Sequence, residues 1–161
     1  MEAIRRRFQI RPIVRALERQ REIAAVITDR FPEERSAIIR KAELATRGKF
    51  DVFGRRDIDF GYPINWRLEP TSGKETPLTH WSRIDYLDPS VAGDKKITWE
   101  LNRHSHFITL GQAYVMTGDE AYAQAFVGQA SSWMDQNPPN LGINWSSSLE
   151  LAFRSISWIW A

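Results

Sequence analysis

The fold is decided by residues 97–136, which read ITWELNRHSHFITLGQAYVMTGDEAYAQAFVGQASSWMDQ. Apolar side chains recur at helical spacing in the first half of this stretch, which predicts one helix over residues 97–116. Gly118 is a typical residue to end that helix, and Asp119 is a typical N-cap for a second helix over residues 120–136. Because the link between them is so short, the two helices must pack antiparallel as a helical hairpin.

A third helix follows the hairpin. The segment Asn-Pro-Pro-Asn at residues 137–140 stops the second helix, and a new helical pattern begins near Ser146 and continues to the last residue. Three antiparallel helices with short connections are typical of an all-α bundle or of a toroid of helical hairpins. The chain ends in the apolar run at residues 156–161, whose carbonyls and tryptophans need partners. We therefore expect the sequence to be the N-terminal piece of a longer protein.

The part of the chain before the hairpin divides into two regions. Two amphipathic helical patterns come first, one opened by Pro12 and one over residues 33–46. Residues 48–97 then carry recurrent Gly and Pro with short β-prone pieces, so we expect an irregular, loop-rich segment that its aromatic side chains pack down. The sequence predicts an N-terminal helical pair in residues 1–47 and a helical domain in residues 48–161.

Composition excludes several classes of protein. The 161 residues include 22 basic and 20 acidic side chains, and this near balance argues against a nucleic-acid partner. Cysteine is absent, which excludes a disulfide scaffold, a thiol nucleophile and a cysteine zinc site. The three histidines lack metal-ligand spacing, and no phosphate-binding glycine loop occurs, so we expect neither a metal nor a cofactor. No apolar run approaches the roughly 18 residues of a membrane span, and no signal peptide is expected in the chain as given.

Polar side chains interrupt the apolar face of the helix predicted over residues 97–116. Glu100 and His104 are one turn apart in the middle of that face. Burying them costs free energy unless they are paired or hydrated. Either they form a pair in the core, or the histidine bonds a carbonyl there, or this face lines a water-filled cleft in which His104 meets a ligand.

The last predicted helix is apolar on most of its circumference except for one narrow polar stripe. Ser146, Glu150, Arg154 and Ser157 lie within about 80° of one another on it. Such a stripe must face another polar stripe or an internal cavity. Local alternatives also exist, because Ser147 and Glu150 match a capping box and Glu150 and Arg154 can form an i,i+4 ion pair.

Several short motifs occur in a fixed order along residues 48–161. They are FGYPINW at 60–66, WELNRH at 99–104, TGDEAYA at 117–123, NPP at 137–139 and GINW at 142–145, followed by Glu150, Arg154 and Trp158. This ordered set resembles the N-terminal region of heparinase II/III family polysaccharide lyases, whereas residues 1–47 match only in being helical. The resemblance implies an all-α fold, the N-terminal part of an incomplete (α/α) toroid built of antiparallel helical hairpins and truncated at its C-terminus.

The resemblance also implies a function. The family cleaves acidic, uronate-containing polysaccharides such as heparan sulfate or alginate by β-elimination, with a tyrosine and a histidine as principal base and acid. The motifs that hold those two residues resemble nothing in this sequence, so we expect them beyond residue 161 and expect the fragment alone to be inactive. The implied partners are the acidic polysaccharide and the rest of the same chain, namely further toroid helices and a β-sandwich domain. The implied location is periplasmic or secreted, and the absence of a signal peptide leaves the cytoplasm open.

Five residues can be carried over from the resemblance as substrate-binding candidates. Asn102, Arg103 and His104 match the family's motif on a helix beside the substrate cleft, and Glu150 and Arg154 match the motif on the following inner helix. The arginines and a protonated His104 would supply charge-assisted hydrogen bonds to a polyanion. On this hypothesis Arg154→Ala weakens substrate use more than it lowers the melting temperature.

Other interpretations remain. The chain is alternatively a non-catalytic carbohydrate-binding or scaffolding helical domain. A glycoside hydrolase would need two carboxylates about 5–9.5 Å apart, and Glu100 and Glu150 are the plausible pair, although each has a basic neighbour that keeps it ionised. Trp66, Trp81 and Trp145 are either sugar-stacking residues or core aromatics.

Overall fold

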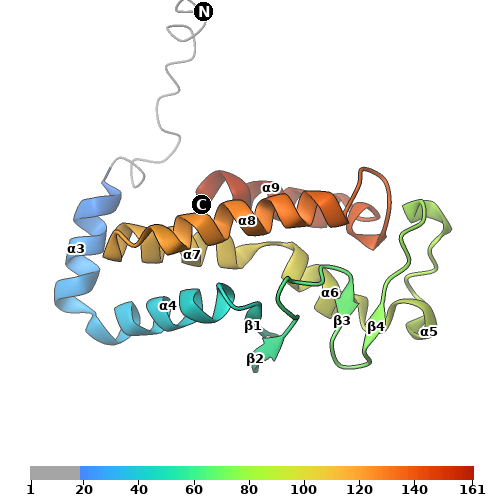
Figure 1. Ribbon diagram of the computed structural model, residues 1–161, viewed down its shortest axis with the longest axis horizontal. Coiled ribbons are helices and arrows are strands. Elements are labelled where there is room, and N and C mark those ends of the chain that lie inside the picture. Colours follow the sequence, from blue (N-terminus) through green and yellow to red (C-terminus); the bar gives the residue numbers. More distant parts are fainter. Residues whose placement is uncertain (1–18) are drawn as a thin grey trace, which may run out of the picture.

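The computed structural model describes residues 19–161 and shows an all-α fold with two small strand pairs (Figure 1). The helix predicted from Pro12 falls partly on residues outside that range, and its described part is α3. The longer helices are α3 (Gln20–Arg30), α4 (Pro32–Ala45), α6 (Lys95–Asn102), α7 (Ser105–Thr117), α8 (Glu120–Gln136) and α9 (Ser148–Trp160). The strands are β1 (Lys49–Val52), β2 (Arg55–Asp59), β3 (Leu68–Glu69) and β4 (Lys74–Glu75), and the short helices are η1 (Trp81–Arg83), α5 (Pro89–Ala92) and η2 (Ile143–Trp145).

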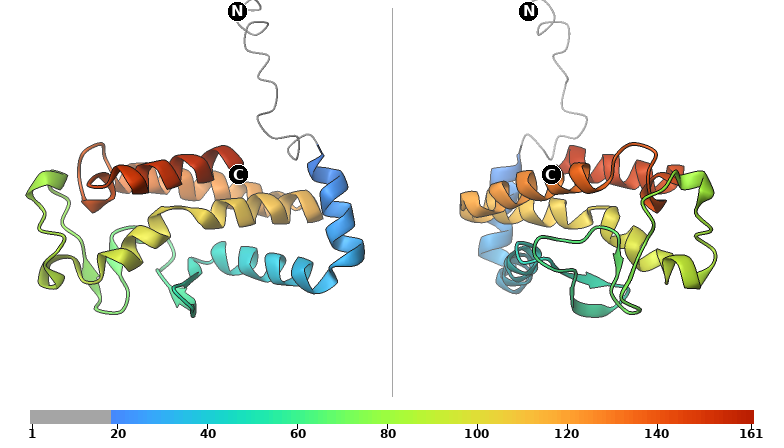
Figure 2. Two further views of the ribbon diagram at one scale, coloured as in Figure 1. Left: turned by 180° about the vertical axis from the view of Figure 1, so that it is seen from behind. Right: turned by 45° about the vertical axis from the view of Figure 1, so that its right-hand side comes forward.

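The predicted helical hairpin is confirmed as α7 and α8. Gly118 ends α7 in the left-handed conformation at φ 71°, and its N–H donates to the carbonyl of Tyr114 at 2.7 Å. Asp119 then caps α8, because its side chain accepts the N–H of Ala121 at 2.9 Å. The chain therefore turns back within two residues, and the two helices lie side by side (Figures 1 and 2).

Helix α7 is the central element of the domain. It packs against α4, α8, α9 and α3, and α3 crosses the end of the layer that the others form (Figure 2). The core between these helices is apolar and largely aromatic, which is how a domain of this size gains most of its stability. Its buried members include Phe50, Phe60, Trp66, Phe107, Leu110 and Trp133.

The irregular segment predicted between residues 48 and 97 is present, with short regular pieces in it. Strands β1 and β2 form an antiparallel hairpin, β3 and β4 form a second one, and η1 and α5 follow. The aromatic side chains in this segment behave differently from one another. Phe60 and Trp66 are fully buried in the core as expected, whereas Tyr62 is 80% exposed.

The prediction of one unbroken helix over residues 97–116 is wrong. Helix α6 ends at Asn102 and α7 begins at Ser105, because His104 takes the left-handed conformation at φ 58°. That conformation is costly for a residue with a side chain, so tertiary contacts must hold it there. The break turns the chain, and α6 and α7 run in different directions (Figure 1).

Helix α9 confirms three of the four residues of the predicted polar stripe and turns them inward, whereas Ser146 lies before the helix, at the end of η2. The buried residues of α9 are Glu150, Arg154 and Ser157, whereas Leu149, Ile156 and Ile159 are exposed. The stripe packs against polar partners of the same domain. Within residues 19–161, no helix has the length and hydropathy needed to cross a bilayer.

Candidate functional site

The helix break at residues 103–104 is held by Asn102, whose side-chain amide is fully used. Its Nδ2 donates to the carbonyls of Trp66 at 2.9 Å and Thr98 at 2.7 Å. Its Oδ1 accepts from Trp133 Nε1 at 2.7 Å and from Asn144 Nδ2 at 3.0 Å. Two donors and two acceptors are all that an asparagine amide offers, so this buried side chain joins four parts of the chain.

His104 lies beside Asn102 and is sealed inside the protein. Its side chain has no exposed surface, and Trp158 Nε1 donates to its Nδ1 at 2.6 Å. Because Nδ1 accepts that hydrogen bond, the neutral ring carries its proton on Nε2. Burial, reinforced by His106 and Arg154, lowers the pKa of His104 well below its ordinary value. The expectation of a protonated His104 is therefore wrong for this structure.

Arg103 lies at the helix break and binds two carboxylates, one of which belongs to α9. Its Nε and Nη2 donate to the two oxygens of Glu150 at 2.7 and 2.9 Å, and its Nη1 donates to Glu100 at 2.6 Å. The bond to Glu150, partly offset by desolvation, raises the pKa of Arg103. The suggested Glu100–His104 pair does not form, because the helix break separates the two residues and Glu100 bonds Arg103 instead.

Two local alternatives for Glu150 also fail. Ser147 is the N-cap residue of α9, but its side chain makes no capping hydrogen bond. Both carboxylate oxygens of Glu150 accept hydrogen bonds from Arg103 instead. Arg154 does not bridge to Glu150 but donates to the carbonyl of Asn144 at 2.9 Å. Tertiary partners therefore replace the capping box and the i,i+4 pair.

Arg154 is a buried cation held between aromatic rings. Its guanidinium carbon lies 4.3 Å from the centre of the Trp133 ring and 5.9 Å from that of Trp145. Burial lowers the pKa of Arg154 to about 10, against the opposing effect of the Glu150 charge. The cation is thus stabilised by π faces, one carbonyl and a nearby carboxylate.

The structure brings all five predicted residues together at one junction between α6, α7, η2 and α9. Asn102, His104, Glu150 and Arg154 are at most 5% exposed, and Arg103 alone keeps a partly exposed side chain. Sequence reasoning did not place four further junction residues in the site, although they stand in the motifs of the resemblance. These are Trp133, Asn137, Asn144 and Trp158.

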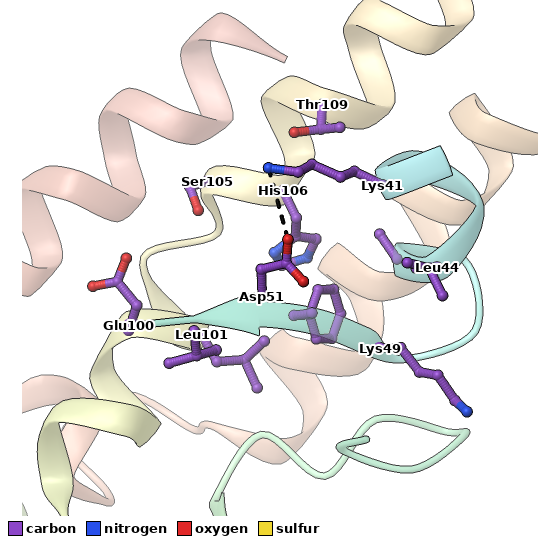
Figure 3. A pocket seen from close by; sticks show the side chains of 12 residues that line it. Lys41, Leu44, Lys49, Asp51, Glu100, Leu101, Ser105, His106 and Thr109 are labelled. Carbon is purple, nitrogen blue, oxygen red and sulfur yellow. Dashed lines mark ion pairs between the residues drawn. The ribbon is translucent and has the colours of Figure 1, made fainter. Parts of the chain in front are cut away.

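An open cavity lies next to this junction, at the base of the β1–β2 hairpin (Figure 3). It has a volume of about 170 Å³ and is lined by α4, β1 and the start of α7. Lys41 and Asp51 face each other across it at 3.7 Å, and Glu100 and His106 also line it. His106 donates its Nε2 proton to Gln129 Oε1 at 3.0 Å, and burial lowers its pKa to about 3. None of the five predicted residues lines this cavity.

The three tryptophans predicted as either sugar-stacking residues or core aromatics differ in burial. Trp66 is fully buried in the core, Trp145 is partly buried against Trp133, and Trp81 is exposed. Among residues 19–161 there is no group of three histidine or carboxylate side chains that would hold a metal ion. The junction is therefore a folded polar core in which no free acid, base or ligand set faces solvent.

The fold and the junction together define a class of protein. It is an all-α domain of helical hairpins in which α9 buries its polar stripe against asparagines and tryptophans. The profile of the family described as heparinase II/III N-terminus matches residues 14–158. The chain belongs to this family.

Three curated relatives are similar to parts of the chain, and each is named heparin-sulfate lyase. The protein from Bacteroides stercoris is 40% identical over 80 residues, and that from Bacteroides thetaiotaomicron is 33% identical over 114 residues. The protein from Pedobacter heparinus is 29% identical over 83 residues. These alignments cover 50%, 70% and 52% of this chain, but only 9%, 16% and 9% of the relatives. No solved structure matches the chain.

Proposed function

We propose that this chain is the N-terminal domain of a polysaccharide lyase that degrades acidic, uronate-containing polymers. The observation that carries the proposal is the family match over residues 14–158, which includes every residue named in the junction. The three relatives named heparin-sulfate lyase support a sulfated glycosaminoglycan as the substrate class. Alginate shares the uronate carboxylate that the reaction needs and is kept as a second substrate to test.

The proposed reaction is a β-elimination. A base removes the proton at C5 of the uronate, the electron pair forms a C4–C5 double bond, and the C4–O glycosidic bond breaks. An acid protonates the leaving oxygen, so that atoms and charge balance. Within residues 19–161 neither His104 nor His106 suits either role, since His104 is sealed inside the protein and burial lowers the pKa of both rings, which makes them weak bases. We propose that the base and the acid come from residues after 161.

The five predicted residues have a positioning role in this proposal. Asn102 and His104 fix the break between α6 and α7, and Arg154 fixes η2 through the carbonyl of Asn144. Arg103 and Glu150 fix α9 to the same break. Together they would set where the helices stand beside a substrate cleft, and Arg103 is the member that reaches the surface to contact substrate.

The rest of the chain is the proposed partner of α9. Leu149, Phe153, Ile156 and Ile159 form an exposed apolar face beside the buried stripe. Such a face is stable only when another element covers it. The relatives are far longer than this chain, so we propose that further toroid helices cover α9 and that a β-sandwich domain follows. We propose a periplasmic or secreted location, where a polymer from outside the cell would reach the protein.

The test is product formation by the full-length protein. Heparin, heparan sulfate and alginate are each incubated with it, and the near-ultraviolet absorbance of the new C4–C5 double bond is followed. Absorbance that grows with at least one uronate polymer is the expected result. Complete absence of unsaturated product with all three, from protein shown to be folded, overturns the proposal.

A second function is favoured by one observation, the burial of the junction. A domain whose polar stripe is sealed between its own helices fits a non-catalytic carbohydrate-binding or scaffolding role as well. Isothermal titration with size-defined heparin fragments separates the two. Binding without unsaturated product favours the second function, and product formation favours the lyase.

A further inference from the structure

The tip of the β1–β2 hairpin is a two-residue turn with an unusual first residue, Phe53. Val52 pairs with Arg55, so Phe53 and Gly54 alone form the loop. Both have positive φ, at 48° and 78°, as a two-residue type I′ turn requires. Asparagine followed by glycine is the preferred sequence for this turn, and a phenylalanine in the left-handed region is strained.

The strained side chain is also exposed. Phe53 has 62% of its surface open to solvent, and a Cβ placed on Gly54 would meet no atom within 4 Å. The hairpin projects from the end of α4, away from α8 and α9 (Figures 1 and 2). The strain is therefore not compensated by packing of the aromatic ring within residues 19–161. Strained, exposed residues of this kind are typical of binding surfaces.

The charges of the hairpin are arranged so that positive charge remains at its tip. Asp57 pairs with Arg40 at 2.8 Å, Asp51 with Lys41 at 3.7 Å, and Asp59 with Lys49 at 3.6 Å. Each acid of the hairpin thus has a basic partner on α4 or β1. Arg55 and Arg56 are exposed and carry the excess charge directly beside Phe53. The two arginines are adjacent at the start of β2, directly after the turn.

We infer that Phe53, Arg55 and Arg56 form a contact site for a sulfated polysaccharide chain, separate from the junction of α6, α7 and α9. Sulfate groups accept charge-assisted hydrogen bonds from guanidinium groups, and an exposed aromatic ring packs on the apolar face of a sugar. The choice of a sulfated glycan as the ligand depends on the proposed function. The evidence for the site comes from the structure of the hairpin alone. It would hold the polymer outside the catalytic cleft.

The test uses three variants of the full-length protein and a heparin decasaccharide in isothermal titration. Replacing Arg55 and Arg56 together by alanine should weaken binding about tenfold, which corresponds to the loss of two surface charge-assisted contacts. The matched control replaces Arg21 and Arg30, two exposed arginines of α3, and should leave the affinity within about twofold of wild type. Phe53→Asn should weaken binding about threefold while raising the melting temperature, because asparagine relieves the strain of the turn.

The outcomes separate this inference from the proposed function. Equal losses in the tip and α3 double variants would overturn the inference, because net charge alone would then explain binding. Equal losses by the tip variant for duplex DNA and for heparin would also overturn it, since the site would then favour no glycan. If the tip variants bind heparin as tightly as wild type while the protein still forms unsaturated product, the tip site is wrong and the proposed lyase function is retained.

Discussion

His104 is buried and His106 is partly buried, both as neutral rings, and this makes the stability of the fold dependent on pH. Burial lowers the pKa of both, in His106 to about 3, whereas an unfolded histidine titrates near 6.5. Between these values the unfolded chain binds protons that the folded chain does not. The free energy of unfolding is therefore highest above pH 6.5 and falls as the pH is lowered, by about 1.4 kcal/mol per pH unit for each histidine.

Denaturant unfolding between pH 7.5 and 5 measures this slope above the range in which most carboxylates titrate. His106→Gln should halve the pH dependence, because one of the two neutral rings is gone. His80→Gln, at an exposed position, is the matched control and should keep the wild-type slope. A slope that His106→Gln leaves unchanged would show that the ring is not buried as a neutral group.

Glu150 and Glu100 both bond Arg103, but they differ in burial. The side chain of Glu150 is 5% exposed and that of Glu100 is 26% exposed. Glu150→Gln removes the charge that faces Arg103 and also supports Arg154, so we expect it to lower the free energy of unfolding by about 2 kcal/mol. Glu100→Gln should cost less than about 0.5 kcal/mol, since water replaces the lost charge. Denaturant titration of both variants checks this, and equal costs would contradict the burial argument.

At the scale of the element, the break between α6 and α7 shows where sequence periodicity fails. The stretch WELNRHSHF contains neither glycine nor proline, so nothing local marks the break. Its causes lie 31 to 54 residues away, in Trp66, Trp133, Asn144 and Trp158. The end of α7 and the start of α8 were predictable because Gly118 and Asp119 act within their own turn.

Two glycines in different elements should respond oppositely to alanine. Gly128 lies inside α8, and a Cβ placed there would meet no atom within 4 Å. Gly128→Ala should raise the free energy of unfolding by about 1 kcal/mol, the usual gain for an exposed helical position. Gly48 has φ 73°, and its Cβ would overlap the carbonyl oxygen of Gly61, so Gly48→Ala should cost at least about 2 kcal/mol. Thermal melting of both variants checks the signs, and a loss in Gly128→Ala would show that an unseen element covers α8.

At the scale of the whole molecule, the sequence predicted which residues lie together but not which partners they bond. The polar stripe of α9 follows from helical periodicity, and so does its need for a polar partner. The identity of that partner depends on how α6, η2 and α9 meet, which no local pattern contains. Glu150 has two local candidates for its bond, Ser147 and Arg154, and instead bonds a third residue, Arg103, from 47 residues away. Burial of the stripe, rather than exposure to a cleft, is therefore a property of the assembled fold.

Arg154 tests what the assembled fold means for function, because its two proposed roles predict different behaviour. As a buried cation between Trp133 and Asn144, it should lower the free energy of unfolding by about 2–4 kcal/mol when replaced by alanine, through a cavity and an unpaired carbonyl. Arg154→Met keeps the volume and removes the cost of burying charge, so most of the melting temperature should return. We expect the full-length Arg154→Met protein also to keep most of its lyase activity per folded molecule. If it instead melts like wild type but loses more than about tenfold in kcat/KM, the guanidinium contacts the substrate, as the sequence motif first suggested.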